Sequence, residues 1–146
     1  TQNAQANPIT TPTAAVTGGS ADEQLSPQDW IKEEDIKVYK DRVEIRLNNP
    51  VWARFADTNS MDPTLDFGSN GIEIPVPDQE ILMPGDVVTY KSKYASGTII
   101  HRIVFKGTDE KGTYYILQGD NLDKPDPEKI YAHENRIENV LVGIIY

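Results

Sequence analysis

Short runs of strand length, several of which alternate between apolar and polar residues, begin at Ile36 and continue to the end of the chain. A period of two is typical of a strand with one buried face, because successive side chains point to opposite faces of a sheet. Gly, Pro, Asn and Asp separate the runs, and the Lys-Asp-Arg sequence at 40–42 predicts a hairpin turn between the first two. Many short strands with little helix predict a mainly β fold, a β-sandwich or a partly open barrel of antiparallel strands. The runs cover residues 36–39, 43–47, 51–55, 72–76, 86–90, 98–105, 113–118 and 140–146.

The N-terminal part of the chain differs in composition. Residues 1–20 contain no charged side chain and are rich in Thr, Ala, Asn, Gln, Pro and Gly, which predicts a flexible arm or linker. Residues 9–17 are rich enough in β-branched side chains to lie along a sheet edge instead. A short helix is expected around 27–31, capped by Ser26 and with Pro27 at its first position. We therefore predict an arm over residues 1–28 and a β domain over residues 29–146.

Charge and cysteine content argue against several classes of function. The chain has 14 Lys and Arg against 23 Asp and Glu, a formal net charge of −9, whereas nucleic-acid binding draws on clustered cations. Without cysteine there is no disulfide, thiolate nucleophile or cysteine-ligated zinc. No motif indicates a nucleotide, flavin or haem site, and we expect no cofactor. Because the chain begins with Thr1, we expect it to be either processed or a shortened soluble part of a longer protein, with membrane association only through an upstream segment.

Three segments carry side chains that together suit nucleophilic catalysis. Ser60 stands in a polar turn that follows a predicted strand, and His101 stands inside an apolar strand. Asp120 and Asp126 occupy a turn directly after another strand. A serine hydroxyl is a poor nucleophile at neutral pH, but an imidazole can accept its proton and a carboxylate can orient the imidazole.

Each of these side chains also has an interpretation without catalysis. A serine in a polar turn is most often a turn residue. His101 is also consistent with a core histidine that has one structural hydrogen bond, and His133 is expected to be exposed in a loop. Acidic side chains after residue 119 are a candidate calcium site, because calcium prefers oxygen ligands, although their spacing differs from that of an EF-hand. These residues are Asp120, Asp123, Asp126 and Glu128.

Four short motifs, in this order, resemble the conserved motifs of type I signal peptidases. They are Ser-Met-Asp-Pro-Thr at 60–64, Pro-Gly-Asp-Val-Val at 84–88, His-Arg-Ile at 101–103 and Gly-Asp-Asn at 119–121. The resemblance covers about residues 52–146. Type I signal peptidases are β-fold serine proteases that remove signal peptides from exported proteins, so the resemblance implies this fold and activity.

The resemblance also implies a role for individual residues. Ser60 corresponds to the nucleophile, and His101 corresponds to the general base. Bacterial members have a lysine at the position of His101, whereas archaeal and endoplasmic-reticulum members have a histidine. Asp126 is our choice for the acid that orients His101, and Asp120 is expected to shape the loop. The Thr58 hydroxyl is expected to join the Ser60 backbone N–H in an oxyanion hole.

Two functions follow from these patterns. The first is a serine endopeptidase of signal-peptidase type that cleaves exported precursor polypeptides, outside the cell or at the outer face of the cytoplasmic membrane. The second is a non-catalytic extracellular surface protein on the same scaffold, which forms filaments by donor-strand addition of the N-terminal arm to another copy. A hydrogen bond between Ser60 and His101 favours the first function.

Overall fold

A computed structural model describes residues 22–146, which fall into two compact units. The smaller unit comprises residues 22–24 and Asp29–Leu47, and the larger unit comprises Leu25–Gln28 and Asn48–Tyr146. The prediction grouped residues 29–47 with the β domain, whereas contacts within the chain separate them from it. The predicted assembly strand at 9–17 lies outside the described residues. No helix within residues 22–146 has the length and apolar character needed to cross a membrane.

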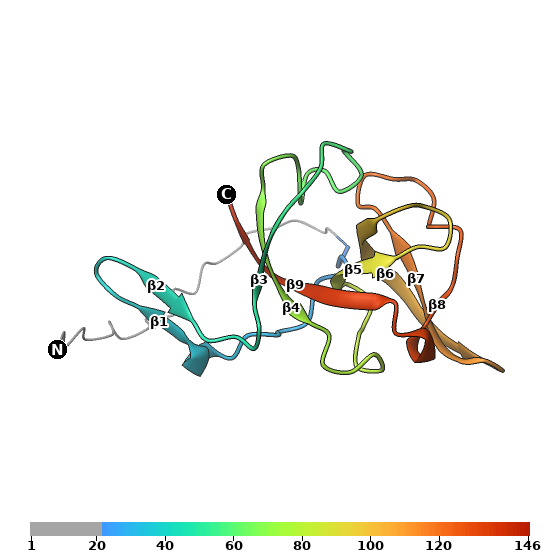
Figure 1. Cartoon of the computed structure of the whole chain (residues 1–146), viewed down its shortest axis with the longest axis horizontal. Coiled ribbons are helices and arrows are strands. Elements are labelled where there is room, and N and C mark those ends of the chain that lie inside the picture. The colour runs from blue at the N-terminus through green and yellow to red at the C-terminus, as the bar shows by residue number, and fades with distance from the viewer. Residues whose placement is uncertain (1–21) are drawn as a thin grey trace. The chain divides into compact units, whose positions relative to one another are not determined.

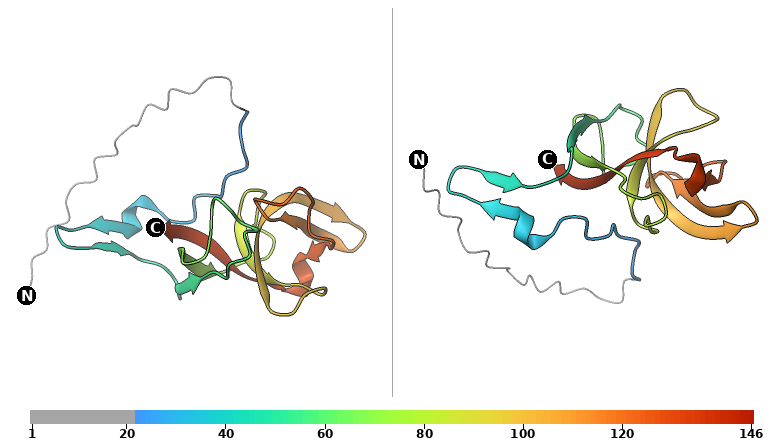
Figure 2. Two further views of the ribbon diagram at one scale, coloured as in Figure 1. Left: turned by 90° about the horizontal axis from the view of Figure 1, so that it is seen from above. Right: turned by 60° about the horizontal axis from the view of Figure 1, so that its bottom comes forward.

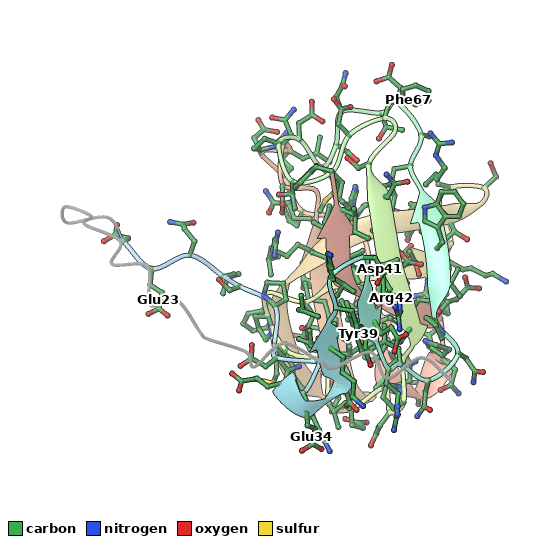
Figure 3. All side chains as sticks on the ribbon, turned by 90° about the vertical axis from the view of Figure 1, so that its left-hand side faces the viewer. Glu23, Glu34, Tyr39, Asp41, Arg42 and Phe67 are labelled. Carbon is green, nitrogen blue, oxygen red and sulfur yellow. The ribbon has the colours of Figure 1, made fainter. Side chains whose placement is uncertain are left out.

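The smaller unit is a β-hairpin. Strands β1 (Ile36–Val38) and β2 (Val43–Ile45) pair antiparallel and follow a short 3-10 helix, η1 (Glu33–Asp35). The turn lies where it was predicted, and the Tyr39 N–H donates to the Arg42 carbonyl at 2.8 Å. The Arg42 guanidinium lies 4.2 Å from the centre of the Tyr39 ring, and Figure 3 shows the two side chains close to each other.

The helix predicted around 27–31 is wrong, because these residues adopt no helical structure. The Gln28 N–H donates to Asp86 Oδ1 at 3.0 Å, and the Gln28 side-chain amide donates to Asp86 Oδ2 at 2.7 Å. The Ser26 backbone lies against Gly85, where an added Cβ would come within 2.0 Å of the Ser26 carbonyl oxygen. The bond to Asp86 occupies the Gln28 N–H, which the Ser26 cap of the predicted helix would have used.

The larger unit contains one antiparallel sheet of seven strands. Its strands are β3 (Val51–Arg54), β4 (Asn70–Pro75), β5 (Val87–Lys91), β6 (Thr98–Asp109), β7 (Gly112–Gln118), β8 (Ile130–Tyr131) and β9 (Ile137–Ile145). They follow the order β3-β4-β9-β5-β6-β7-β8, as Figure 1 shows, and the sheet does not close into a barrel. The prediction of a mainly β, antiparallel fold with little helix is confirmed. Strand β8 and the 3-10 helix that follows it, η2 (Ala132–Glu134), were not predicted.

The last strand of the chain lies in the middle of this sheet. Strand β9 pairs with β4 on one side and with β5 on the other (Figure 2). Leu141 of β9 and Val87 of β5 form a buried cluster with Met61 and Leu65, which come from the connection between β3 and β4. This packing fixes the connection that carries Ser60 onto one face of the sheet.

Candidate active site

Ser60 lies in the connection between β3 and β4, which packs beside the connection between β7 and β8 at the same end of the sheet (Figure 1). Asn59 has φ 60, a left-handed conformation that asparagine tolerates better than most residues. Met61 is buried on the other side of Ser60. The Ser60 carbonyl accepts a hydrogen bond from the Asn121 N–H at 2.9 Å. Ser60 is thus fixed between an anchored methionine and the Gly-Asp-Asn motif.

His101 connects Ser60 to an acidic side chain. It stands in β6, is only 7% exposed, and lies with its Nε2 atom 3.3 Å from Ser60 Oγ. Its Nδ1 atom lies 2.8 and 2.9 Å from the two carboxylate oxygens of Asp126. An Nδ1–H that donates to Asp126 leaves Nε2 free to accept the Ser60 proton. The structure therefore brings together the three side chains that the sequence suggested.

Tyr90 is a fourth member of this chain of hydrogen bonds, and no sequence motif pointed to it. Tyr90 is buried in β5, and its hydroxyl donates to Asp126 Oδ2 at 2.6 Å. Burial, and then the hydrogen bond to Asp126, raise the pKa of Tyr90 above its ordinary value. Tyr90 therefore stays protonated and holds the carboxylate that faces His101. Tyr90 is the last residue of the predicted strand run at 86–90, and nothing in its neighbours distinguishes it from an ordinary buried strand residue.

Asp120 has a separate set of partners. Arg102 donates to both of its carboxylate oxygens at 2.8 Å, and Thr64 donates its hydroxyl to one of them. Burial would raise the pKa of Asp120, but the bonds from Arg102 and Thr64 outweigh burial and lower it. Arg102 also donates to the Gly85 carbonyl at 2.7 Å, so the motifs at 60–64, 84–88, 101–103 and 119–121 meet in one network. These contacts join Asp120 to Arg102 and Thr64, and its expected loop-shaping role stays a prediction.

Gly119 allows the two connections to approach each other closely. A Cβ at this position would lie 2.5 Å from the Ser60 carbonyl oxygen and 3.0 Å from His101 Nε2. Real Cβ atoms do not approach backbone atoms this closely. A glycine is therefore required beside Ser60 and His101, which explains its place in the motif.

Thr58 lies beside the candidate nucleophile. Its hydroxyl oxygen is 3.2 Å from Ser60 Oγ, and both residues line the same cleft. Within residues 22–146, no acceptor is bonded to the Ser60 N–H. That N–H is therefore available for an oxyanion, and the role expected for Thr58 remains a prediction.

A cleft of about 620 Å³ opens beside Ser60 and His101. Strand β3 lines one part of it, and polar side chains from β4, β5 and β9 line another. These are Glu73, Thr89 and Glu138, which we call the Glu73 group. Burial, and then the charge of Glu138, raise the pKa of Glu73 to about 6. This group was not predicted, and its only signal in the sequence is one glutamate between two isoleucines in β4.

The acidic residues considered as a calcium site form hydrogen bonds with different side chains. Asp120 bonds to Arg102, Asp126 bonds to His101, and Glu128 bonds to Arg136 at 2.6 Å. No group of three or more potential metal ligands occurs within residues 22–146. His133 is exposed, as expected, although it lies in η2 rather than in a loop.

Comparison of the chain with protein-family models, with curated proteins and with solved structures finds no match.

Proposed function

We propose that this chain is a serine endopeptidase in which Ser60 is the nucleophile, His101 the general base and Asp126 the acid that orients it. The observation that carries the proposal is the continuous series of contacts from Asp126 through His101 to Ser60 Oγ, at 2.8 and 3.3 Å. The resemblance of four motifs to type I signal peptidases supports the same assignment. We further propose exported precursor polypeptides as substrates, and a location outside the cell or at the outer face of the cytoplasmic membrane.

The geometry suits acyl transfer in two steps. Ser60 Oγ attacks the carbonyl carbon of the scissile peptide bond while its proton moves to His101 Nε2, and Asp126 stabilises the imidazolium. The Ser60 N–H stabilises the oxyanion of the tetrahedral intermediate. The C–N bond then breaks, and the departing amine takes the proton from Nε2. Water attacks the acyl ester with His101 again as base, which releases the carboxylate product and restores Ser60.

We expect an extended polypeptide substrate to bind along β3. This strand is at one edge of the seven-stranded sheet and pairs only with β4 within the described residues. Ala53 and Arg54 of β3 line the cleft together with Ser60. An extended segment that pairs with the free edge of β3 would therefore pass the Ser60 hydroxyl.

Cleavage of a signal-bearing precursor by the purified chain tests this function, with the product termini identified by mass spectrometry. We expect Ser60→Ala and His101→Ala each to lower kcat/KM by about 10⁴-fold or more, because both side chains take part in the proton transfer. Matched controls are Ser96→Ala and His133→Ala, which change exposed residues outside the site. The controls should retain activity within about twofold. Equal turnover by Ser60→Ala and the original chain, or no turnover by either, contradicts the proposal.

A further inference from the structure

Glu73 is a buried carboxylate without a full set of partners. It is 3% exposed, and its Oε1 atom has no hydrogen-bond partner among the described residues. Thr89 Oγ1 is likewise buried and unpartnered within residues 22–146. Buried polar atoms nearly always have partners, and an unpaired buried charge is costly. Both residues line the same cleft, so their unpartnered atoms indicate a ligand that supplies hydrogen-bond donors.

The strand register places both side chains on the face of the sheet that carries the Ser60 connection. Glu73 is opposite Leu141, and Thr89 is opposite Asn139. Leu141 and Asn139 are two residues apart in β9, so their side chains share one face. Leu141 packs against Met61, the neighbour of Ser60. A peptide bound beside Ser60 is thus on the same face as the two unpartnered atoms.

The charges around Glu73 favour a cationic donor. Glu138 also lines the cleft and raises the negative charge near Glu73, although its own carboxylate pairs with Lys91 at 3.1 Å. Arg54 lines the cleft as well, but in the register of β3 and β4 it stands opposite Asn70, which is three residues from Glu73. That separation is about 10 Å along the strand.

From these observations we propose that the Glu73 group is a subsite for a lysine or arginine side chain of the peptide substrate. This inference rests on the proposed function and names a feature of its substrates. A lysine ammonium has three donors and an arginine guanidinium has five, so either side chain can supply the donor that Glu73 Oε1 lacks. The positive charge replaces the solvation that Glu73 loses on burial.

Peptide binding and cleavage by the full chain test the inference. The probes are acetylated and amidated alanine-rich decapeptides in which lysine, glutamine or norleucine occupies each position in turn. We measure binding to the Ser60→Ala chain by calorimetry and cleavage by the original chain. At one position, lysine should exceed norleucine by about tenfold or more in affinity and in kcat/KM, since a charge-assisted bond contributes about that much.

Glu73→Gln keeps the shape of the side chain and removes its charge, so it should reduce the lysine-to-norleucine ratio to about one. Thr89→Val should reduce the same ratio a few-fold, because it removes one acceptor. Glu110→Gln, in the exposed turn between β6 and β7, is the control and should keep the full ratio. Thermal unfolding of each variant shows whether it remains folded.

The outcomes separate this inference from the proposed function. Cleavage of neutral peptides without a lysine preference at any position overturns the subsite and leaves the peptidase. An equal gain from glutamine, or a lysine preference that survives Glu73→Gln in a folded chain, also overturns it. If no peptide binds and none is cleaved, both proposals fail.

Discussion

Two groups of side chains line or adjoin the same cleft, and they differ in how completely their charges are partnered. We call Ser60, His101, Asp126 and Tyr90 the Ser60 group. In this group both oxygens of Asp126 face His101, and one of them also accepts the Tyr90 hydroxyl. In the Glu73 group, a carboxylate oxygen and a threonine hydroxyl have no partner within residues 22–146.

This difference distinguishes a site that is organised in advance from one that is complete only with a ligand. A fully bonded polar network holds its members in fixed positions and rotamers, as proton transfer requires. A buried acceptor without a donor has an unfavourable free energy that a bound donor can relieve. The cleft thus combines groups that suit reaction with groups that suit recognition.

Asp126→Asn tests the organised side of this comparison and should have the largest effect. Asparagine fills the same space but cannot stabilise an imidazolium and can select the wrong tautomer of His101. We expect kcat/KM for a signal-bearing precursor to fall by about 10⁴-fold, the loss known for such a change in a serine protease triad. A fall of less than tenfold would mean that Asp126 does not orient the base.

Asp120→Asn tests whether the second carboxylate of the loop has a structural role. Its side chain is 16% exposed and that of Arg102 is 14% exposed, so the substitution leaves a largely buried guanidinium without its anion. We expect the free energy of unfolding to fall by about 2 to 3 kcal/mol in urea denaturation. Asp123→Asn is the exposed control on the same loop and should unfold like the original chain. If Asp120→Asn is as stable as the original chain, Asp120 does not have the structural role that sets it apart from Asp126.

Glu73→Gln tests the incomplete side through the pH dependence of stability. The pKa of Glu73 is about 6 in the folded chain, above its ordinary 4.5. Between these values the folded state binds more protons than the unfolded state, so this group lowers stability as pH rises from 4.5 to 6. The difference in the free energy of unfolding between Glu73→Gln and the original chain should therefore shift by about 2 kcal/mol in favour of Glu73→Gln as pH rises from 4 to 7.

Urea denaturation of both chains across this range measures that difference. Glu110→Gln should show no such gain, because its side chain is exposed. Parallel stability curves for Glu73→Gln and the original chain would show that Glu73 is already satisfied in the folded state.

Tyr90→Phe should have the smallest effect of these substitutions. It removes one hydrogen bond to Asp126 and keeps the buried ring. We expect kcat to fall about tenfold with little change in KM, because the tyrosine positions the acid and lies outside the cleft lining. Tyr94→Phe, at a residue that is 71% exposed, is the control. A rise in KM at constant kcat would assign Tyr90 to substrate binding instead.

Much of the fold followed from local pattern. Six of the eight predicted strand runs differ from the observed strands by no more than about two residues at each end, as is usual for strand boundaries. The two larger differences are β6, which continues to Asp109, and β9, which begins at Ile137. Strand β8 has only two residues and therefore no detectable period. The helix around residue 29 was wrong because Asp86, far away in sequence, binds the Gln28 backbone.

The candidate site was predictable only in part. Ser60, His101 and Asp126 stand in motifs that can be read along the chain, and the structure brings them together. Tyr90 and Thr89 look like ordinary strand residues, so their roles depend on what lies opposite them. Glu73 carries a weak signal, a charge inside an apolar strand, but that pattern fits an exposed position equally well.

The sequence by itself determined the β character of the chain, the turns between its strands and the residue types available for chemistry, because these depend on neighbours along the chain. Only the tertiary structure decided which side chains meet. Strand β9 lies between β4 and β5, and the connections that follow β3 and β7 converge at one end of the sheet. Hydrogen bonds and burial act over a few ångströms in space, so a carboxylate that is bonded and one that lacks a partner look alike until the sheet is assembled.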